Sequence, residues 1–301
     1  MKPKIISWNV RGLNDINKRL WIRNLLQEWK ADIVCLQETK LKMIDRRLVR
    51  SLWSGIYIDW VFLASNGVSG GVVVMWDRRM VERMEDFMGR YTVACSFKCV
   101  SDNFLWAFAG VYGPNLDTDR RLLWVELAGI HSWWDIPLCI GGDFNVVRFP
   151  SEVSGCRRLR MAMEEFSECI FELSLVDLPL AGGTVTWSNN QSWSRLDHFL
   201  ISPERESHFP DVWQKRMPRI GSDHWPIMLD GGGIRKGQRP LKFENMWLKA
   251  DGFVDKVKQW WSSYQFQGTL SFIFAGKLKA LKRDLKAWNV ESFGNVEEVK
   301  N

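Results

Sequence analysis

Hydrophobic residues along the chain alternate between short apolar runs and helically spaced positions. The runs are rich in Val, Ile, Phe and Trp and are bounded by turn residues, a pattern that predicts strands. The predicted strands are Lys4–Asn9, Ile33–Gln37, Tyr57–Leu63, Gly71–Trp76, Thr92–Cys99, Phe104–Tyr112, Leu138–Ile140, Asp197–Ile201 and His224–Leu229. Three groups between them each share one helical face: Ile22, Leu25, Leu26 and Trp29; Leu123, Leu127, Ile130 and Trp134; Met163, Phe166, Ile170 and Leu173. Helices interspersed with hairpin-like strand pairs favour a layered α/β fold with mixed sheets.

The run Asp230-Gly231-Gly232-Gly233 marks a domain boundary. We therefore predict one domain over residues 1–230, a linker over 231–240 and a separate helical segment over 241–301. In that segment Leu278, Leu281, Leu285 and Trp288 recur at helical spacing, and lysines and an arginine occupy the other faces. This pattern predicts a basic amphipathic helix.

The positive charge of the chain is concentrated in that last segment. Residues 1–230 hold 28 basic and 28 acidic side chains, whereas residues 231–301 hold 13 and 7. A basic tail suits a polyanionic partner, and a merely solvated helix face is the alternative that the sequence leaves open.

Composition narrows the class of protein. Hydrophobic residues make up 46% of the chain and charged residues 25%, which is ordinary for a globular protein. No apolar run approaches the ~20 residues that a membrane span needs, and no signal peptide is recognised at the N-terminus. The six cysteines mostly lie in apolar runs and show no zinc-binding spacing, so we expect reduced, buried thiols in an intracellular protein.

Polar residues that suit phosphodiester hydrolysis follow or open several predicted strands. They are Asn9, Glu38, Tyr112, Asp143, Asn145, Asp197, Asp223 and His224. Each alone has a structural explanation, such as a turn, a helix cap or a solvated strand end. Together they match what the reaction needs: oxygen ligands for a divalent cation, an activated water and groups that bind the phosphate.

The motifs around these residues carry a family resemblance. They are Ser7-Trp8-Asn9-Val10-Arg11-Gly12, Leu36-Gln37-Glu38-Thr39, Val111-Tyr112-Gly113-Pro114, Gly142-Asp143-Phe144-Asn145, Ser194-Arg195-Leu196-Asp197 and Ser222-Asp223-His224. Over about residues 3–230 the chain resembles the endonuclease/exonuclease/phosphatase superfamily. Within it, two stretches are most similar to the endonuclease domain of LINE-type non-LTR retrotransposons, particularly plant lineages. They are Trp8-Asn9-Val10-Arg11-Gly12-Leu13 and Thr186-Trp187-Ser188-Asn189. The tail resembles the segment that connects this domain to reverse transcriptase.

The resemblance implies a four-layer α/β/β/α sandwich of two packed mixed sheets, as in deoxyribonuclease I, followed by the helical tail. It also implies a metal site. Glu38 is then the principal ligand of Mg²⁺, with Mn²⁺ as a substitute, and Asn9 assists the metal or the phosphate. Asp223 and Asp197 are candidates for a second metal position.

The remaining implied roles concern the substrate. Asp143 polarises the attacking water, Asn145 orients it, and Tyr112 contacts a phosphate oxygen. His224 hydrogen-bonds the scissile phosphate and is oriented by Asp197 or by Asp223. Whether Asp143 or an Asp–His224 pair is the general base stays open.

Three further residues complete the implied site. Ser222 contacts the phosphate, and Thr186, in a surface hairpin, touches the DNA backbone. His198 adjoins Asp197, but neighbours on a strand point to opposite faces, so we expect a structural role for His198.

One departure bears on the substrate. Some DNA-repair relatives carry an additional acidic metal-site residue shortly after the first asparagine, where this chain reads Val10-Arg11-Gly12. The difference disfavours a role in abasic-site repair.

The leading hypothesis is a Mg²⁺-dependent endonuclease that nicks DNA, derived from a LINE-type retrotransposon without its reverse transcriptase. We expect DNA as partner, no membrane, no small-molecule cofactor, a monomer and a nuclear location. The alternatives are a phosphomonoesterase or phosphoinositide phosphatase on the same fold, and a non-catalytic nucleic-acid-binding remnant.

Overall fold

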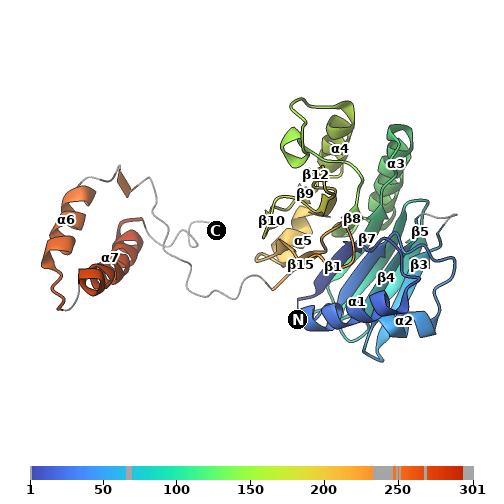
Figure 1. Cartoon of the computed structure of the whole chain (residues 1–301), viewed down its shortest axis with the longest axis horizontal. Coiled ribbons are helices and arrows are strands. Elements are labelled where there is room, and N and C mark those ends of the chain that lie inside the picture. The colour runs from blue at the N-terminus through green and yellow to red at the C-terminus, as the bar shows by residue number, and fades with distance from the viewer. Residues whose placement is uncertain are drawn as a thin grey trace. The chain divides into compact units, whose positions relative to one another are not determined.

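The chain divides into two compact units, Met1–Arg235 and Lys236–Asn301, in a computed structural model of the protein (Figure 1). The structure describes residues 2–65, 70–232, 247–248, 250, 252–267 and 270–293. Of the predicted linker, residues 233–240 lie outside the described residues. Each unit is considered by itself.

The first unit is built on two mixed sheets. The seven-stranded sheet has the order β10-β14-β15-β1-β2-β4-β3 and the six-stranded sheet the order β5-β6-β7-β8-β13-β9. The first sheet holds β1 (Lys4–Asn9), β2 (Ile33–Gln37), β3 (Ile58–Leu63), β4 (Val72–Asp77), β10 (Leu180–Ala181), β14 (Trp213–Arg216) and β15 (Ile227–Asp230). The second holds β5 (Val81–Met88), β6 (Thr92–Cys99), β7 (Leu105–Tyr112), β8 (Leu138–Asp143), β9 (Val176–Asp177) and β13 (Asp197–Ile201), and β11 (Trp187–Ser188) pairs with β12 (Trp193–Ser194) in a separate hairpin. In the first sheet β1 pairs with β2 in parallel and with β15 in antiparallel orientation.

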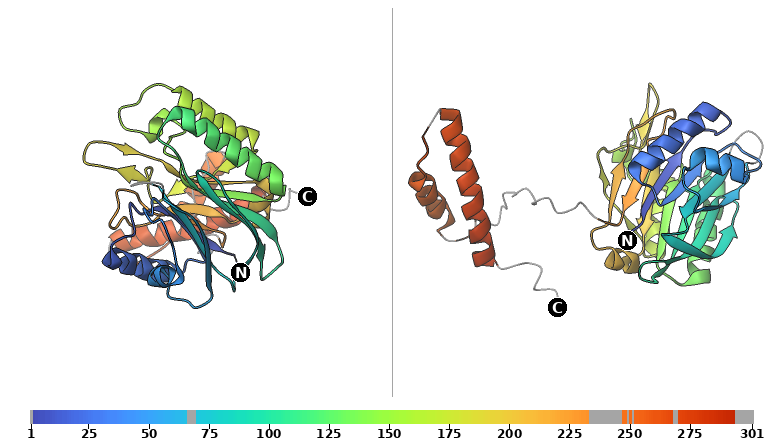
Figure 2. Two further views of the ribbon diagram at one scale, coloured as in Figure 1. Left: turned by 90° about the vertical axis from the view of Figure 1, so that its right-hand side faces the viewer. Right: turned by 90° about the horizontal axis from the view of Figure 1, so that it is seen from below.

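Helices cover the outer faces of both sheets, as Figure 2 shows. The helices are α1 (Ile16–Trp29), α2 (Arg46–Leu52), α3 (Asp117–Trp134), α4 (Met161–Glu172) and α5 (Pro203–His208), with a 3-10 turn at Pro150–Glu152. One core cluster lies between the sheets and joins Trp76 of β4 to Phe97 of β6 and Phe199 of β13. Two further clusters lie under α1 and α2 and under α3 and α4. The predicted four-layer α/β/β/α sandwich is confirmed.

The local sequence explains how α1 is placed. The Asp15 side chain accepts a hydrogen bond from the backbone N–H of Asn17, which caps the helix. Ile22, Leu26 and Trp29 then recur on the buried face, and the helix ends at Lys30 in a left-handed conformation.

Strand β8 and the start of β15 differ from the prediction. Strand β8 continues through the two glycines to Asp143, rather than stopping at Ile140. The predicted start of the strand His224–Leu229 is wrong, because His224 makes only an isolated bridge to Trp187 and β15 begins at Ile227.

The second unit contains α6 (Phe253–Ser263) and α7 (Leu270–Phe293). Trp247, Phe253, Leu285 and Trp288 form its buried cluster. Leu278, expected on the apolar face of the tail helix, is 46% exposed. Among the described helices of the whole chain, none is long and apolar enough to cross a membrane.

Candidate active site

The strand ends of both sheets bring most of the predicted residues to one edge of the sandwich. Asn9 pairs with Gln37 at the ends of β1 and β2, and Glu38 follows directly. In the other sheet, Asp143 lies opposite Tyr112 of β7 and also opposite Asp197 of β13. Side chains at the ends of five strands from the two sheets therefore meet at this edge.

A hydrogen bond joins the two sheets at the centre of the edge. Nδ2 of Asn9 donates to Oδ2 of Asp143 over 2.8 Å, and both side chains are buried. The close approach of β8 to its neighbour β7 requires Gly142, because a Cβ there would lie 2.1 Å from the carbonyl oxygen of Val111. The backbone N–H of Asn145 donates to Oδ1 of Asp143, which fixes both oxygens of this carboxylate.

His224 lies between two buried carboxylates. Its Nδ1 is 2.9 Å from Oδ2 of Asp197, and its Nε2 is 3.6 Å from Oδ2 of Asp143. Burial alone lowers the pKa of His224, but the charges of Asp197 and Asp143 outweigh it and raise the pKa to about 9. Burial raises the pKa of Asp143 to about 6 against the opposing effect of His224. At neutral pH the pair is thus a cationic donor beside an ionised acceptor.

Thr186 lies beneath this cluster rather than on a DNA-facing surface. Its side chain is fully buried, and its hydroxyl accepts hydrogen bonds from the backbone N–H groups of Leu196 and Asp197, each over 2.9 Å. The expected contact of Thr186 with the DNA backbone is therefore incorrect, and Thr186 positions Asp197 instead.

Ser222 joins the loop before β15 to the end of β1. Its hydroxyl donates to the carbonyl oxygen of Asn9 over 2.8 Å and accepts from the backbone N–H of His224 over 3.2 Å. The hydroxyl proton is thus already donated to Asn9, although the half-buried side chain still lines the neighbouring groove.

Asp223 turns away from its neighbour His224. Its Oδ2 accepts from a guanidinium nitrogen of Arg11 over 2.7 Å and from Nε1 of Trp187 over 2.8 Å. Of the two aspartates considered as partners of His224, Asp197 is the one in contact. Sequence reasoning missed the roles of Arg11 and Trp187, although both lie inside the quoted motifs.

Glu38 and Tyr112 form a second part of the edge. Glu38 has a left-handed backbone (φ 52°), and its Oε1 lies 3.0 Å from Nζ of Lys40. Burial and the charges of Glu38 and Asp143 raise the pKa of Tyr112, which also hydrogen-bonds Glu38. Tyr112 therefore remains a protonated phenol at physiological pH.

Asn145 is held by the loop after β7. Its backbone is left-handed (φ 52°), and its Nδ2 donates to the carbonyl oxygen of Gly113 over 2.7 Å. The side-chain amide is thereby fixed next to Asp143, and its NH₂ group already donates a hydrogen bond.

A groove adjoins the site on the side of the β11–β12 hairpin. Its lining residues are Ser188, Asn189, Asn190, Gln191, Arg219, Gly221, Ser222 and Asp223. Arg219 donates to the carbonyl oxygen and hydroxyl of Ser188, and its guanidinium lies 4.1 Å from the ring centroid of Trp225. The hairpin is thereby fastened to the loop that carries Asp223.

His198 points to the opposite face of β13, as expected from strand geometry. Its Nδ1 lies 3.3 Å from Asp177 Oδ1, and its ring packs edge-on against Phe144 and Phe166. Arg195 also contacts Asp177, over 2.8 Å. This second buried Asp–His pair is a structural counterpart of the pair formed by Asp197 and His224.

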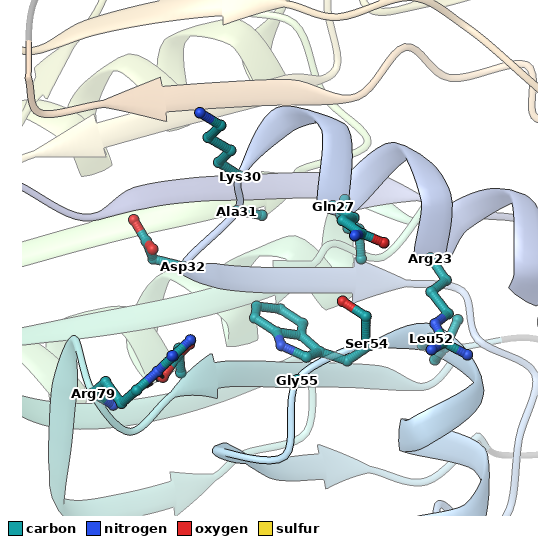
Figure 3. Close-up of a pocket in the computed structure, with 12 residues that line it drawn as sticks. Arg23, Gln27, Lys30, Ala31, Asp32, Leu52, Ser54, Gly55 and Arg79 are labelled. Atoms are coloured by element: carbon teal, nitrogen blue, oxygen red, sulfur yellow. Dashed lines mark hydrogen bonds and ion pairs between the residues drawn. The ribbon is translucent and has the colours of Figure 1, made fainter.

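A separate hollow lies around the start of β2 and the end of β4 (Figure 3). Arg23 and Lys30 of the α1 region line it together with Asp32 and Arg79. No residue predicted for catalysis is among those that line it.

The chain belongs to the Endonuclease/Exonuclease/phosphatase family, whose sequence profile matches residues 6–224. An exodeoxyribonuclease of Bacillus subtilis is 27% identical over 264 residues, which are 75% of this chain and 98% of that protein. The nucleases and phosphatases of this family are metal-dependent hydrolases of phosphoester bonds.

Solved structures share the fold. The endonuclease domain of TRAS1, a telomere-specific non-LTR retrotransposon, has a TM-score of 0.59 at 13% identity over 76% of this chain and 98% of that domain. An AP endonuclease from Archaeoglobus fulgidus has a TM-score of 0.57 at 18% identity over 75% and 98% of the two chains. A mannosyl-6-phosphatase from Bacteroides thetaiotaomicron has a TM-score of 0.53 at 16% identity over the same shares.

The residues at the edge fit the metal that the family uses. Asp143, Asp197 and His224 each carry a possible ligand atom within 4.8 Å of the others, but because His224 is protonated at neutral pH, only the two carboxylates can bind a cation there. Oδ1 of Asp197 is buried and has no hydrogen-bond partner in the described part of the chain. Buried carboxylate oxygens of this kind are ligands for a hard divalent cation.

Proposed function

We propose that the chain is a Mg²⁺-dependent endonuclease that nicks one strand of DNA and leaves a 3′-hydroxyl. The carrying observation is the buried assembly of Asp143, Asp197 and His224, linked through Asn9 to the other sheet. The names of similar proteins support DNA as substrate, since they include an exodeoxyribonuclease and the endonuclease domain of a non-LTR retrotransposon.

The electrostatics of the cluster support a division of roles. Asp143 is ionised above its pKa of about 6, so it accepts the proton of the attacking water. His224 is protonated below about pH 9, so it donates a hydrogen bond to the anionic phosphate, and Asp197 holds its ring in place. Asn9 and Asn145 orient the phosphate and the water.

Glu38, with Asn9, would hold the Mg²⁺ ion, or Mn²⁺ in its place. When bound, the ion supplies positive charge that stabilises the pentavalent phosphate. Tyr112 hydrogen-bonds Glu38 and thereby orients its carboxylate toward the edge.

The groove next to the site supports DNA as the substrate. Its walls carry the amides of Asn189, Asn190 and Gln191 and the cation of Arg219, groups that contact sugar and phosphate in protein–DNA complexes. A retrotransposon origin, a nuclear location and a monomeric state belong to this proposal.

A second candidate is a phosphomonoesterase on the same fold. The solved structure of a mannosyl-6-phosphatase with this fold favours it. Release of inorganic phosphate from sugar or inositol phosphates, without nicking of DNA, would replace the first proposal by this one.

Relaxation of supercoiled plasmid in Mg²⁺, compared with EDTA, tests the proposal. We expect nicked circles with the wild type and none with Glu38→Ala or His224→Ala. His131→Ala, on α3 and remote from the edge, is the matched histidine control and keeps the wild-type rate. Persistent nicking by both site variants would contradict the mechanism, and DNA binding without any nicking would indicate a non-catalytic remnant.

A further inference from the structure

Three cations gather on the side of the site formed by the loop between β1 and α1. Arg11 follows β1, Lys18 lies in the first turn of α1, and Lys40 follows β2. Arg11 contacts Asp223, and Lys40 contacts Glu38, so two of the three stand beside carboxylates of the candidate site. All three reach solvent, the side chain of Arg11 being 53% and that of Lys40 32% exposed.

The three charges are close enough to act on one another. The pKa of Lys18 is lowered by its partial burial and then by the positive charges of Lys40 and Arg11. Lys18 also stands at the positive end of the α1 dipole, in a first turn that carries no acidic residue. The carboxylates of Glu38 and of the N-cap residue Asp15 oppose this lowering, but the net direction of the pKa shift of Lys18 stays downward.

These cations continue the groove described above. A Cβ on Gly221 would lie 4.0 Å from Cε of Lys18, and Arg11 is bonded to Asp223. Gly221 and Asp223 both line the groove. The cluster is therefore at the border between the groove and the catalytic edge.

We propose that Arg11, Lys18 and Lys40 form a cradle that binds a non-scissile phosphate of the DNA strand held in the groove. This proposal rests on the proposed function, because it assumes a nucleic-acid substrate. An anion in the cradle neutralises the mutual repulsion of the three cations. The cradle fixes the register of the strand, so that the neighbouring phosphodiester lies at His224 and Asp143.

Arg19, in contrast to Lys18, is a structural cation. It also lies in the first turn of α1, but its guanidinium donates to the backbone carbonyl oxygens of Leu13 and Asn14. It holds the loop in shape, whereas Lys18 one residue earlier is directed toward the groove side.

Binding of a short DNA duplex, measured in EDTA so that no strand is cut, tests the cradle. The test variant is Lys18→Gln/Lys40→Gln. The matched control is Arg23→Gln/Lys30→Gln, which removes two cations from the hollow of Figure 3, around the start of β2. Arg11 is left in place because its removal would also release Asp223.

The slope of log binding constant against log salt concentration is the readout, since each phosphate contact contributes about −0.9. We expect the test variant to lose about 1 to 2 from the magnitude of this slope, and the control to keep it. The KM of the test variant for plasmid nicking in Mg²⁺ should rise at least several-fold.

Equal slopes for wild type, test variant and control would overturn the cradle while leaving nicking, and hence the proposed function, intact. A wild-type chain that neither binds nor nicks the duplex would instead contradict the proposed function itself. Unchanged thermal unfolding of both double variants shows that the comparison concerns folded protein.

Discussion

Oδ2 of Asp197 lies 2.9 Å from Nδ1 of His224, and this contact joins the first residue of β13 to the loop that precedes β15. Asp197 belongs to one sheet and His224 to the loop that leads into a strand of the other, so the pair exists only when both sheets are packed. The nearby Asp177–His198 pair has similar chemistry but faces away from the edge. This duplication provides an internal control for the role of the pair.

Asp197→Asn should lower the nicking rate by about 10²–10⁴-fold, the range of a lost proton-transfer group, because His224 loses its charge and orientation. The pKa of His224, followed by NMR, should fall from its raised value. In Asp177→Asn the rate per folded molecule should stay near that of the wild type. A normal rate in Asp197→Asn would show that His224 needs no partner.

Asp177→Asn should instead reduce stability. Breaking a buried charge network typically costs about 3–5 kcal/mol, and here Arg195 and His198 lose the Asp177 carboxylate while Arg195 keeps its contact with Glu152. Although burial alone raises the pKa of Asp177, His198, Arg195 and Arg148 hold it below 3.8.

The pH dependence of this effect follows from the sign of the shift. The pKa of Asp177 is lower in the folded than in the unfolded protein. Its ionised carboxylate therefore stabilises the fold above the unfolded-state pKa, and this stability is lost as pH falls through the folded-state pKa. The difference in unfolding free energy between wild type and Asp177→Asn should therefore be full at neutral pH and shrink below about pH 4. Urea unfolding over this pH range measures it, and a pH-independent difference would exclude the ionised carboxylate as its source.

Thr186→Val should destabilise the domain and slow nicking, because two buried N–H groups lose their acceptor. Each unsatisfied group costs about 1–3 kcal/mol. Thr186→Ser keeps the acceptor and should behave like the wild type in both respects. DNA affinity should be the same in all three proteins, and a selective loss of affinity in Thr186→Val would restore the DNA contact expected from the sequence.

Divalent ions should stabilise the wild type as well as activate it. An ion that binds only the folded state adds about 2.7 kcal/mol at a concentration of 100 Kd, so Mg²⁺ should raise the Tm. Glu38→Gln should weaken this rise, and EDTA should abolish nicking in every variant. A Tm that ignores Mg²⁺ in the wild type would argue against an ion site at the edge.

Gly142→Ala should cost more than about 3 kcal/mol, because the added methyl would meet the backbone of Val111 rather than a movable side chain. Gly129 offers the opposite case. It lies in α3 with open space around its Cβ position, so Gly129→Ala should stabilise the domain by roughly 0.5–1 kcal/mol. Thermal unfolding of the two variants would give shifts of opposite sign.

Much of the fold follows from patterns that reflect burial. Strands β1, β2, β6 and β13 match the predicted bounds because their residues are nearly all buried and each strand contains an apolar run. Strand β5 was not predicted, since seven of its eight residues are exposed and four are charged. Its pairing with β6, rather than its own composition, keeps it extended.

The candidate site was predictable only as a set of residue types. The sequence predicts Asn9, Asp143 and Asp197 as polar residues at strand ends. Whether these residues lie close together depends on the order of the strands in the sheets. The sequence could not show that Thr186 is buried, because the family resemblance placed it in a surface hairpin. It also could not distinguish Asp197 from Asp223 as the partner of His224, since that choice depends on how the loop before β15 turns.

The pairing of β1 with β15 has a consequence for protein synthesis. Asn9 precedes Ser222 by 213 residues, yet its carbonyl oxygen is held by the Ser222 hydroxyl, and His224 follows Ser222 by two residues. A growing polypeptide on the ribosome thus has no complete cluster until nearly the whole first unit has emerged. A chain that stops before that point would carry the carboxylates of Asp143 and Asp197 without the imidazole that completes the cluster.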